Sequence, residues 1–204
     1  MFLVSRIILW RHGQTPFNAQ KRLQGQIDVP LSDLGREQAE MASRVLAKYG
    51  VTHIVSSDLS RAKSTGNALA EKIGLTVEQD SRFRERSFGL WEGLNADEIK
   101  SKWSGEYEKW LLGEVADGVQ IEPIAQVGSR FANGVNYYAE KYGEDSVIVI
   151  ASHGSAISKA LLALLGLSFD FRGFKIMNNC AWAVLDKAYS GDWVLSGYNL
   201  SADK

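Results

Sequence analysis

Five short apolar segments of the chain have the pattern of strands. They cover residues 7–10, 54–55, 147–151, 181–185 and 193–195. The run at 147–151 is β-branched and unbroken, which is typical of a strand covered on both faces. The last two runs flank Ser190, Gly191 and Asp192, and short polar turns of this kind between two apolar runs predict a β-hairpin.

Amphipathic segments alternate with these strands. Apolar side chains recur at helical spacing within residues 38–49, 59–73, 127–142 and 156–164. We expect Ser32 to cap the first of these helices and Asp58 the second, because short polar side chains satisfy free N–H groups at helix starts. Strands that alternate with helices predict an α/β fold, here a single three-layer α/β/α domain over residues 1–204 with a largely parallel central sheet.

The least regular part of the chain lies between the second and third of these helices. Residues 113–123 mix Gly, Pro and acidic side chains, which predicts a surface loop, with a lid or substrate loop as the alternative. We place the lid or substrate-loop region around residues 86–125.

Composition and charge narrow the function. The 204 residues include 23 Lys and Arg and 24 Asp and Glu, a net charge of −1 that provides no long-range attraction for a nucleic acid. Cys180 is the only cysteine, which excludes an intrachain disulfide and a cysteine-based zinc site. No apolar stretch approaches the roughly 18 residues of a membrane span, and the N-terminus lacks a secretory signal pattern. We therefore expect a cytoplasmic protein without a membrane or nucleic-acid partner; a homodimer stays open.

Two of the three histidines share one context. His12 follows the first predicted strand and His153 follows the run at 147–151, and each is succeeded by a glycine, Gly13 or Gly154. Ligands of open α/β sheets bind where strands end, so both imidazoles should lie at one edge. The glycines let the backbone turn and let a ligand approach its N–H groups. His53 begins a strand, and we expect it to be structural.

Arginines in the same positions indicate a phosphate site. Arg11 adjoins His12, and Arg61 lies one turn into the helix that follows residues 54–55. Guanidinium groups bind phosphate oxygens with two parallel hydrogen bonds, and a neutral imidazole can attack phosphorus. We therefore expect His12 to form a phosphohistidine while Arg11, Arg61 and His153 stabilise the charge on the phosphoryl oxygens.

The leaving group needs a proton, and Glu85 is the candidate donor. It stands among Arg82, Arg84 and Arg86, whose charges should lower its pKa, whereas a general acid needs a raised pKa. In an extended segment the arginines would point away from the Glu85 side, and the sequence leaves this open.

These residues resemble the histidine phosphatase superfamily, in its phosphoglycerate mutase-like branch. The resemblance rests on residues 9–15 (LWRHGQT), Asn18, Gln24-Gly25, residues 31–35 (LSDLG), residues 56–62 (SSDLSRA), Arg84-Glu85 with Gly89, Trp91, Glu92 and Gly93, and residues 152–154 (SHG). It implies His12 as the phosphorylated nucleophile, Glu85 as the proton donor, and no metal or other cofactor. It also implies that Asn18 lies near the phosphate and that Gln24 and Gly25 form a substrate-side loop. We add Gly154 to these substrate-binding candidates, and Trp91, for which packing in the core is the alternative.

Within this family a phosphatase fits better than a cofactor-dependent phosphoglycerate mutase. The mutases have a tyrosine, a lysine, an arginine pair and an asparagine where this chain has Phe88, Ala96, only Arg130 in residues 95–130, and Ser155. A mutase needs such cations to hold a second charged group. The sequence thus favours a metal-independent phosphatase of small phosphorylated metabolites, with the mutase as the alternative.

The candidate site and three short segments bear further on the function. A binding module without catalysis is disfavoured, because a binder needs no nucleophile and acid together. Residues 179–182 (NCAW), with 11–15 and 24–26, are similar to actinobacterial members of the family, including glucosyl-3-phosphoglycerate phosphatases.

Overall fold

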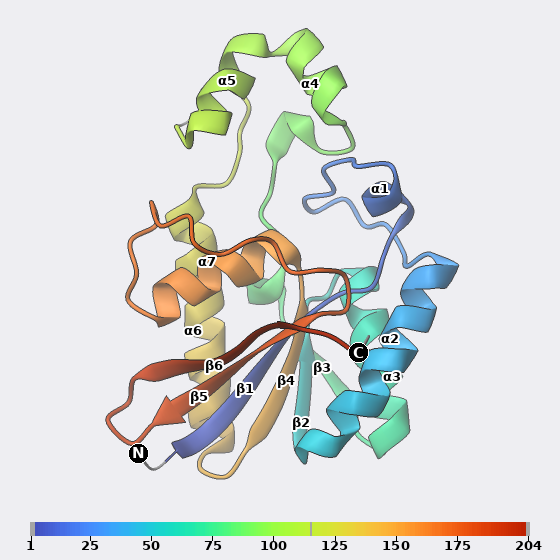
Figure 1. Cartoon of the computed structure of the whole chain (residues 1–204), viewed down its shortest axis with the longest axis vertical. Coiled ribbons are helices and arrows are strands. Elements are labelled where there is room, and N and C mark those ends of the chain that lie inside the picture. Colours follow the sequence, from blue (N-terminus) through green and yellow to red (C-terminus); the bar gives the residue numbers. More distant parts are fainter. Residues whose placement is uncertain (1–2, 115, 203–204) are drawn as a thin grey trace.

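The fold is organised around a six-stranded sheet in the order β3-β2-β4-β1-β5-β6 (Figure 1). The structure is a computed structural model that describes residues 3–114 and 116–202. The strands are β1 (Leu3–Arg11), β2 (His53–Ser56), β3 (Val77–Gln79), β4 (Val147–Ser152), β5 (Trp182–Ala188) and β6 (Trp193–Leu200). β1 to β4 are parallel, whereas β5 pairs antiparallel with both β1 and β6. The predicted largely parallel sheet and the predicted hairpin are confirmed.

Helices cover both faces of this sheet (Figure 1). α2 (Asp33–Leu46) and α3 (Ser60–Ile73) pack on one face, and α6 (Ile124–Tyr142) and α7 (Gly154–Leu164) on the other. β1 shows how the sequence produces two cores, because successive strand side chains point to opposite faces. Ile7 and Leu9 pack with α6 and α7, whereas Ile8 and Trp10 pack with α2 and α3. The three-layer α/β/α prediction is confirmed. None of the helices in the described ranges is both long enough and apolar enough to span a bilayer.

Of the two predicted helix caps, one is correct. The Ser32 hydroxyl accepts a hydrogen bond from the Gly35 N–H, as expected for the residue that caps α2. The prediction for Asp58 is wrong, because its carboxylate binds the Arg84 guanidinium through two hydrogen bonds of 2.8 and 2.6 Å. The first N–H of α3, that of Ser60, donates instead to the Asp28 carboxylate. A charge-assisted pair is stronger than a cap, which accounts for the exchange.

Residues 86–114 and 116–125, here called the cap, fold over the edge of the sheet where β1 and β4 end (Figure 1). The cap contains two helices that the sequence pattern did not indicate, α4 (Ala96–Lys102) and α5 (Ser104–Leu112). It has its own apolar cluster, formed by Phe88, Trp91, Ile99, Ala116 and Val119. Residues 113–114 and 116–123 form no helix or strand, as the loop prediction expects, but Val119 is fully buried and its carbonyl accepts the Leu90 N–H. That the cap moves as a lid stays a prediction.

Two short elements complete the chain. α1 (Pro16–Ala19) follows β1, and its first N–H groups are satisfied by a capping box between Thr15 and Asn18. The capping box thus fixes the conformation of the short segment that follows His12. β3 was not indicated by the sequence pattern either, since only three residues form it at the edge of the sheet.

Candidate active site

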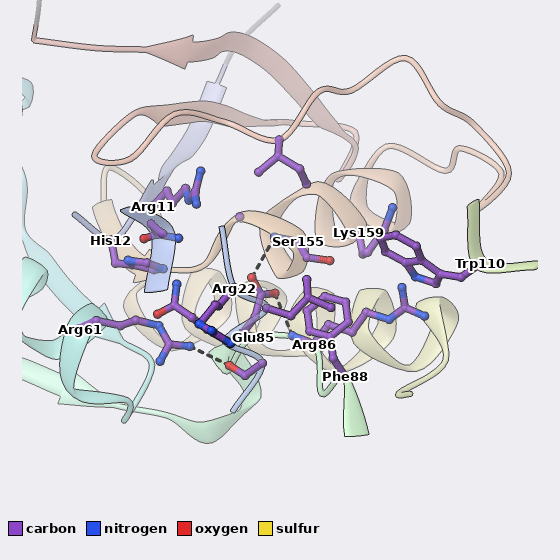
Figure 2. Close-up of a pocket in the computed structure, with 16 residues that line it drawn as sticks. Arg11, His12, Arg22, Arg61, Glu85, Arg86, Phe88, Trp110, Ser155 and Lys159 are labelled. Carbon is purple, nitrogen blue, oxygen red and sulfur yellow. Dashed lines mark hydrogen bonds between the residues drawn. The ribbon is translucent and has the colours of Figure 1, made fainter. Parts of the chain in front are cut away.

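A cavity of about 330 Å³ opens at the edge of the sheet beneath the cap. Its wall contains eight of the ten predicted site residues: Arg11, His12, Asn18, Gln24, Gly25, Arg61, Glu85 and Gly154. In Figure 2, Arg11, His12 and Arg61 lie at one end, Lys159 and Trp110 lie at the other, and Glu85 stands between them. His153 and Trp91 are fully buried and do not form part of the wall.

His12 is held as a neutral base. Its Nδ1 lies 2.6 Å from the Gly13 carbonyl oxygen, and since a carbonyl only accepts, Nδ1 carries the proton. The lone pair is therefore on Nε2. Burial, reinforced by the charges of Arg61 and Arg11, holds the pKa of His12 well below its usual 6.5. An imidazole in this state has the free electron pair that a nucleophile requires.

His153 presents a proton to the same place. Arg61 Nε donates to His153 Nδ1 at 3.2 Å, which leaves the His153 proton on Nε2. That Nε2 is buried and has no hydrogen-bond partner within the described residues. The two imidazole rings are 5.2 Å apart and meet edge to face. His153 thus provides an unpartnered N–H donor on a ring next to that of His12.

Arg61 joins this pair to the substrate-side loop. Its guanidinium is fully buried and donates to the carbonyls of Gly25 at 2.7 Å and Ile27 at 2.8 Å. Burial lowers the pKa of Arg61 to about 10, so it stays charged at neutral pH. Three of its five N–H groups are engaged, which leaves two for an anion in the cavity.

Arg11 contributes a second buried guanidinium. One Nη donates to the Met177 carbonyl, while Nε has no partner in the described part of the chain. A Cβ on Gly154 would lie 3.1 Å from that Nε and 2.7 Å from Ile176, so only a glycine lets α7 begin this close to Arg11. Unpartnered donors of Arg11 and His153 thus lie beside His12, and buried donors of this kind call for an acceptor such as a phosphoryl oxygen.

The substrate-side loop is shaped by Gly25 and Glu92. Gly25 has a φ of +51°, and a Cβ there would come within 2.0 Å of a Glu92 carboxylate oxygen. The same oxygen accepts the Gln26 N–H, and the Gln24 side-chain oxygen accepts a hydrogen bond from the Thr15 hydroxyl at 2.9 Å.

Asn18 is oriented by two donors. Its Oδ1 accepts from Asn179 Nδ2 and from the Thr15 backbone N–H, and none of the described residues accepts from its amide N–H groups, which are left for the cavity.

Glu85 lies at the N-terminus of α7. Its carboxylate accepts the N–H groups of Ser155 at 3.1 Å and Ala156 at 2.7 Å, which are first-turn donors without intrahelical partners (Figure 2).

The three arginines next to Glu85 bind other groups: Arg82 binds Asp80, Arg84 binds Asp58, and Arg86 Nε donates to the Glu122 carbonyl. None of the three guanidiniums therefore pairs with the Glu85 carboxylate.

Arg130 positions the segment that carries Glu85. Its guanidinium is bound by the Glu122 carboxylate at 2.7 Å and donates to the backbone carbonyls of Arg82, Arg84 and Glu85. Arg130 is thus not a substrate cation, which agrees with its absence from the cavity wall.

We expect Arg130→Met to lower the free energy of unfolding by about 2–4 kcal/mol, because three carbonyls and one carboxylate lose a charged donor. Urea denaturation at neutral pH measures this loss. Replacing Arg44, an exposed residue of α2, by methionine serves as the control. Equal midpoints for the two variants would contradict the clamping role.

A pH dependence of stability follows from the two buried imidazoles. Burial is the largest cause that lowers the pKa values of His12 and His153 well below 6.5, and the positive charge of Arg61 is the next largest. Below about pH 6.5 both histidines are protonated in the unfolded chain but stay neutral in the folded chain. The free energy of unfolding therefore has its full value above that pH and falls as the pH is lowered further. The decline approaches about 1.4 kcal/mol per pH unit for each histidine. Urea denaturation between about pH 7.5 and 5.5 should show a shallower slope for His12→Ala than for the unchanged chain; equal slopes would contradict the assignment.

Trp91 packs in an apolar core, the alternative stated for it, and the composition of the outer wall differs from expectation. Trp91 packs in the cap cluster against Tyr107 and Trp110, and Trp110 rather than Trp91 reaches the cavity. The outer wall is formed by Arg22, Leu23, Arg86, Phe88, Trp110, Lys159 and Ile176. Sequence reasoning considered Arg22 for the cavity mouth but favoured a solvated loop, and it missed the other six. The chain lacks the mutase cations at the positions named above, but it supplies cations from elsewhere, because three residues of the outer wall are basic. Lys159 could have been found, since it follows Ser155 by one helical turn and so shares its face of α7.

Comparison with known proteins identifies the family. Residues 7–201 match the sequence pattern of the histidine phosphatase superfamily, branch 1. The chain belongs to this superfamily. A glucosyl-3-phosphoglycerate phosphatase of Mycolicibacterium vanbaalenii is 36% identical over 98% of this chain and 87% of its own length. A probable phosphoglycerate mutase of Yersinia pestis is 32% identical over 95% of this chain and 89% of its own length.

A solved structure agrees with this assignment. A mycobacterial glucosyl-3-phosphoglycerate phosphatase in complex with VO₃ superimposes with a TM-score of 0.86 at 33% identity, covering 96% of this chain and 99% of that one. The matches support an enzyme of this superfamily that hydrolyses phosphomonoesters. Within residues 3–114 and 116–202, no group of three or more His, Cys, Asp and Glu side chains is placed to hold a metal ion.

Proposed function

We propose that this chain is a metal-independent phosphatase that hydrolyses small phosphomonoesters through a phosphohistidine on His12. The observation that carries the proposal is the 2.6 Å contact between His12 Nδ1 and the Gly13 carbonyl oxygen. Because a carbonyl only accepts, this contact requires the proton on Nδ1 and leaves the lone pair on Nε2. This base shares one cavity with Arg11, Arg61 and Glu85. Nucleophile, charge stabilisation and proton donor are the three requirements of phosphoryl transfer to a side chain.

The reaction proceeds in two displacements. His12 Nε2 attacks phosphorus, the bond from phosphorus to the ester oxygen breaks, and a protonated Glu85 gives its proton to the departing alcohol. Arg11, Arg61 and His153 donate to the phosphoryl oxygens and stabilise their charge in both steps. Water then attacks the phosphohistidine, Glu85 takes the proton of that water, and inorganic phosphate leaves. Both His12 and Glu85 return to their starting states.

The substrate class rests on size and on the relatives. A cavity of about 330 Å³ matches a small metabolite better than a macromolecule. The phosphatase from M. vanbaalenii is named for glucosyl-3-phosphoglycerate, which makes phosphorylated glycerates and sugars the first compounds to test. We further propose that this activity is cytoplasmic and that the chain has no nucleic-acid or membrane partner.

Phosphate release from a panel of phosphorylated glycerates, sugars and nucleotides tests the proposal. The chain is first treated with EDTA, and we expect release to persist because His12 and the arginines supply the nucleophile and the charge stabilisation. Loss of activity with the chelator and its return with a divalent ion would overturn metal independence. Isomerisation of 3-phosphoglycerate without phosphate release, dependent on a bisphosphorylated cofactor, would instead establish the mutase.

A further inference from the structure

Two cations of the outer cavity wall form no hydrogen bond or ion pair with a carboxylate of the described residues. Three basic side chains reach this part of the wall, namely Arg22, Arg86 and Lys159. Arg22 is neutralised by two hydrogen bonds to the Glu98 carboxylate, at 2.7 and 3.0 Å. Within residues 3–114 and 116–202, no carboxylate is paired in this way with Arg86 or Lys159.

Lys159 is the clearer of the two. It is half-buried on α7, and no hydrogen bond or ion pair joins its ammonium group to any described residue. Burial and the neighbouring charges of Arg86 and Arg172 lower its pKa. The carboxylate that acts on Lys159 electrostatically is Glu85, whose oxygens are occupied by backbone N–H groups. A half-buried ammonium group among like charges costs free energy unless an anion joins it.

The Arg86 guanidinium is oriented by one hydrogen bond, and its remaining N–H groups can donate to a ligand. Its Nε donates to the Glu122 carbonyl oxygen at 2.7 Å, which orients the guanidinium. The Glu122 carboxylate is taken by Arg130 and by the Ser87 N–H, so it does not neutralise Arg86 in a direct pair. Both Nη groups of Arg86 therefore remain without a hydrogen-bond partner among the described residues. Oriented guanidinium groups of this kind bind carboxylates and phosphoryl groups with two parallel hydrogen bonds.

We propose that Arg86 and Lys159 form a second anion subsite, which binds a carboxylate or a further phosphoryl group on the alcohol part of the substrate. This inference rests on the proposed phosphatase function. The departing oxygen must lie beside Glu85, which is held by the Ser155 N–H. Lys159 follows Ser155 by four residues on α7, about 6 Å further along the helix. The second anionic group thus lies a few bonds beyond the ester oxygen.

The rest of the outer wall fits the same ligand. Phe88 and Trp110 line the cavity between the cap and α7, and they present apolar faces where the carbon skeleton of the alcohol would lie. A substrate bound in this way has its phosphoryl group at His12, its skeleton against the aromatic rings and its second charge at Lys159. Phosphomonoesters of neutral alcohols lack the third contact.

Two matched pairs of substrates test the subsite. 3-Phosphoglycerate has a carboxylate where glycerol 3-phosphate has a hydroxymethyl group. Fructose 1,6-bisphosphate has a second phosphoryl group where fructose 6-phosphate has a free hydroxyl. We expect kcat/KM to favour the more anionic member of at least one pair by about tenfold or more, as one charge-assisted contact provides. The pair that shows the preference identifies the anion.

The variant Lys159→Met should reduce that preference to near unity, whereas Lys159→Arg should retain most of it. Lys63→Met, which removes an exposed lysine of α3, is the matched control and should leave the preference unchanged. Equal kcat/KM values within both pairs, or a Lys159→Met variant that lowers both members of a pair equally, would overturn the subsite. If the unchanged chain releases phosphate from none of the four compounds nor from p-nitrophenyl phosphate, the proposed function itself fails.

Discussion

Replacing His12 by alanine should lower kcat for phosphate release by on the order of 10⁴-fold or more, as expected when the nucleophile of a covalent mechanism is removed. The remaining donors of Arg11, Arg61 and His153 still bind phosphate but have no atom to transfer it to. The phosphoenzyme gives a second readout. Substrate labelled at phosphorus, quenched in alkali after a single turnover, should label the unchanged chain and leave the His12→Ala chain unlabelled.

The matched control for this experiment is His53→Ala. His53 begins β2 and stacks on Tyr142 at 3.5 Å, away from the cavity wall, in agreement with the structural role expected for it. Its replacement should leave both turnover and labelling intact. A His12→Ala chain that melts normally and still turns over at a tenth of the original rate would rule out His12 as the nucleophile.

Replacing Glu85 by glutamine should produce an effect that depends on the leaving group. General acid catalysis contributes about 10²–10⁴-fold, so kcat for an alkyl phosphate such as a phosphorylated sugar should fall by that factor. A p-nitrophenolate leaves without a proton, because it is a much weaker base than an alkoxide. For p-nitrophenyl phosphate we therefore expect the first step to lose far less than it does for the sugar phosphate.

Burst kinetics separate the two steps of this variant. Glu85 also activates the attacking water, so p-nitrophenol should appear in a rapid first turnover and slowly afterwards, as the phosphohistidine accumulates. Glu140→Gln, on the exposed side of α6, is the control and should behave like the unchanged chain. Equal losses for the alkyl and aryl substrates in the first turnover would exclude Glu85 as the proton donor.

The sheet and the inner site were predictable because each is encoded locally. Apolar runs such as residues 147–151 form strands that are buried on both faces, and the residue after a parallel strand lies at the carboxyl edge. His12 and His153 are therefore brought together by strand order alone, with the His12 N–H bonded to the Ser152 carbonyl. Two strand ends and one following helix suffice to place Arg11 and Arg61 beside them.

The cap and the outer wall were not predictable, because long-range contacts decide them. α5 exposes Leu111 and Leu112 and buries none of its own residues fully, so its pattern carries no amphipathic signal. Which tryptophan reaches the cavity depends on how α5 packs on Trp91. The loss of the Asp58 cap has the same origin, since Arg84 is 26 residues away along the chain.

The separate apolar cluster of the cap has an evolutionary consequence. Phe88, Trp91, Ile99, Ala116 and Val119 share no member with the two clusters that flank the sheet. Substitutions among these residues can accumulate without disturbing the packing that holds the strand ends in register. We therefore expect that the outer cavity wall can change in evolution while the strand ends keep their packing, so that exchanging the cap between related chains should alter substrate selectivity on the same scaffold.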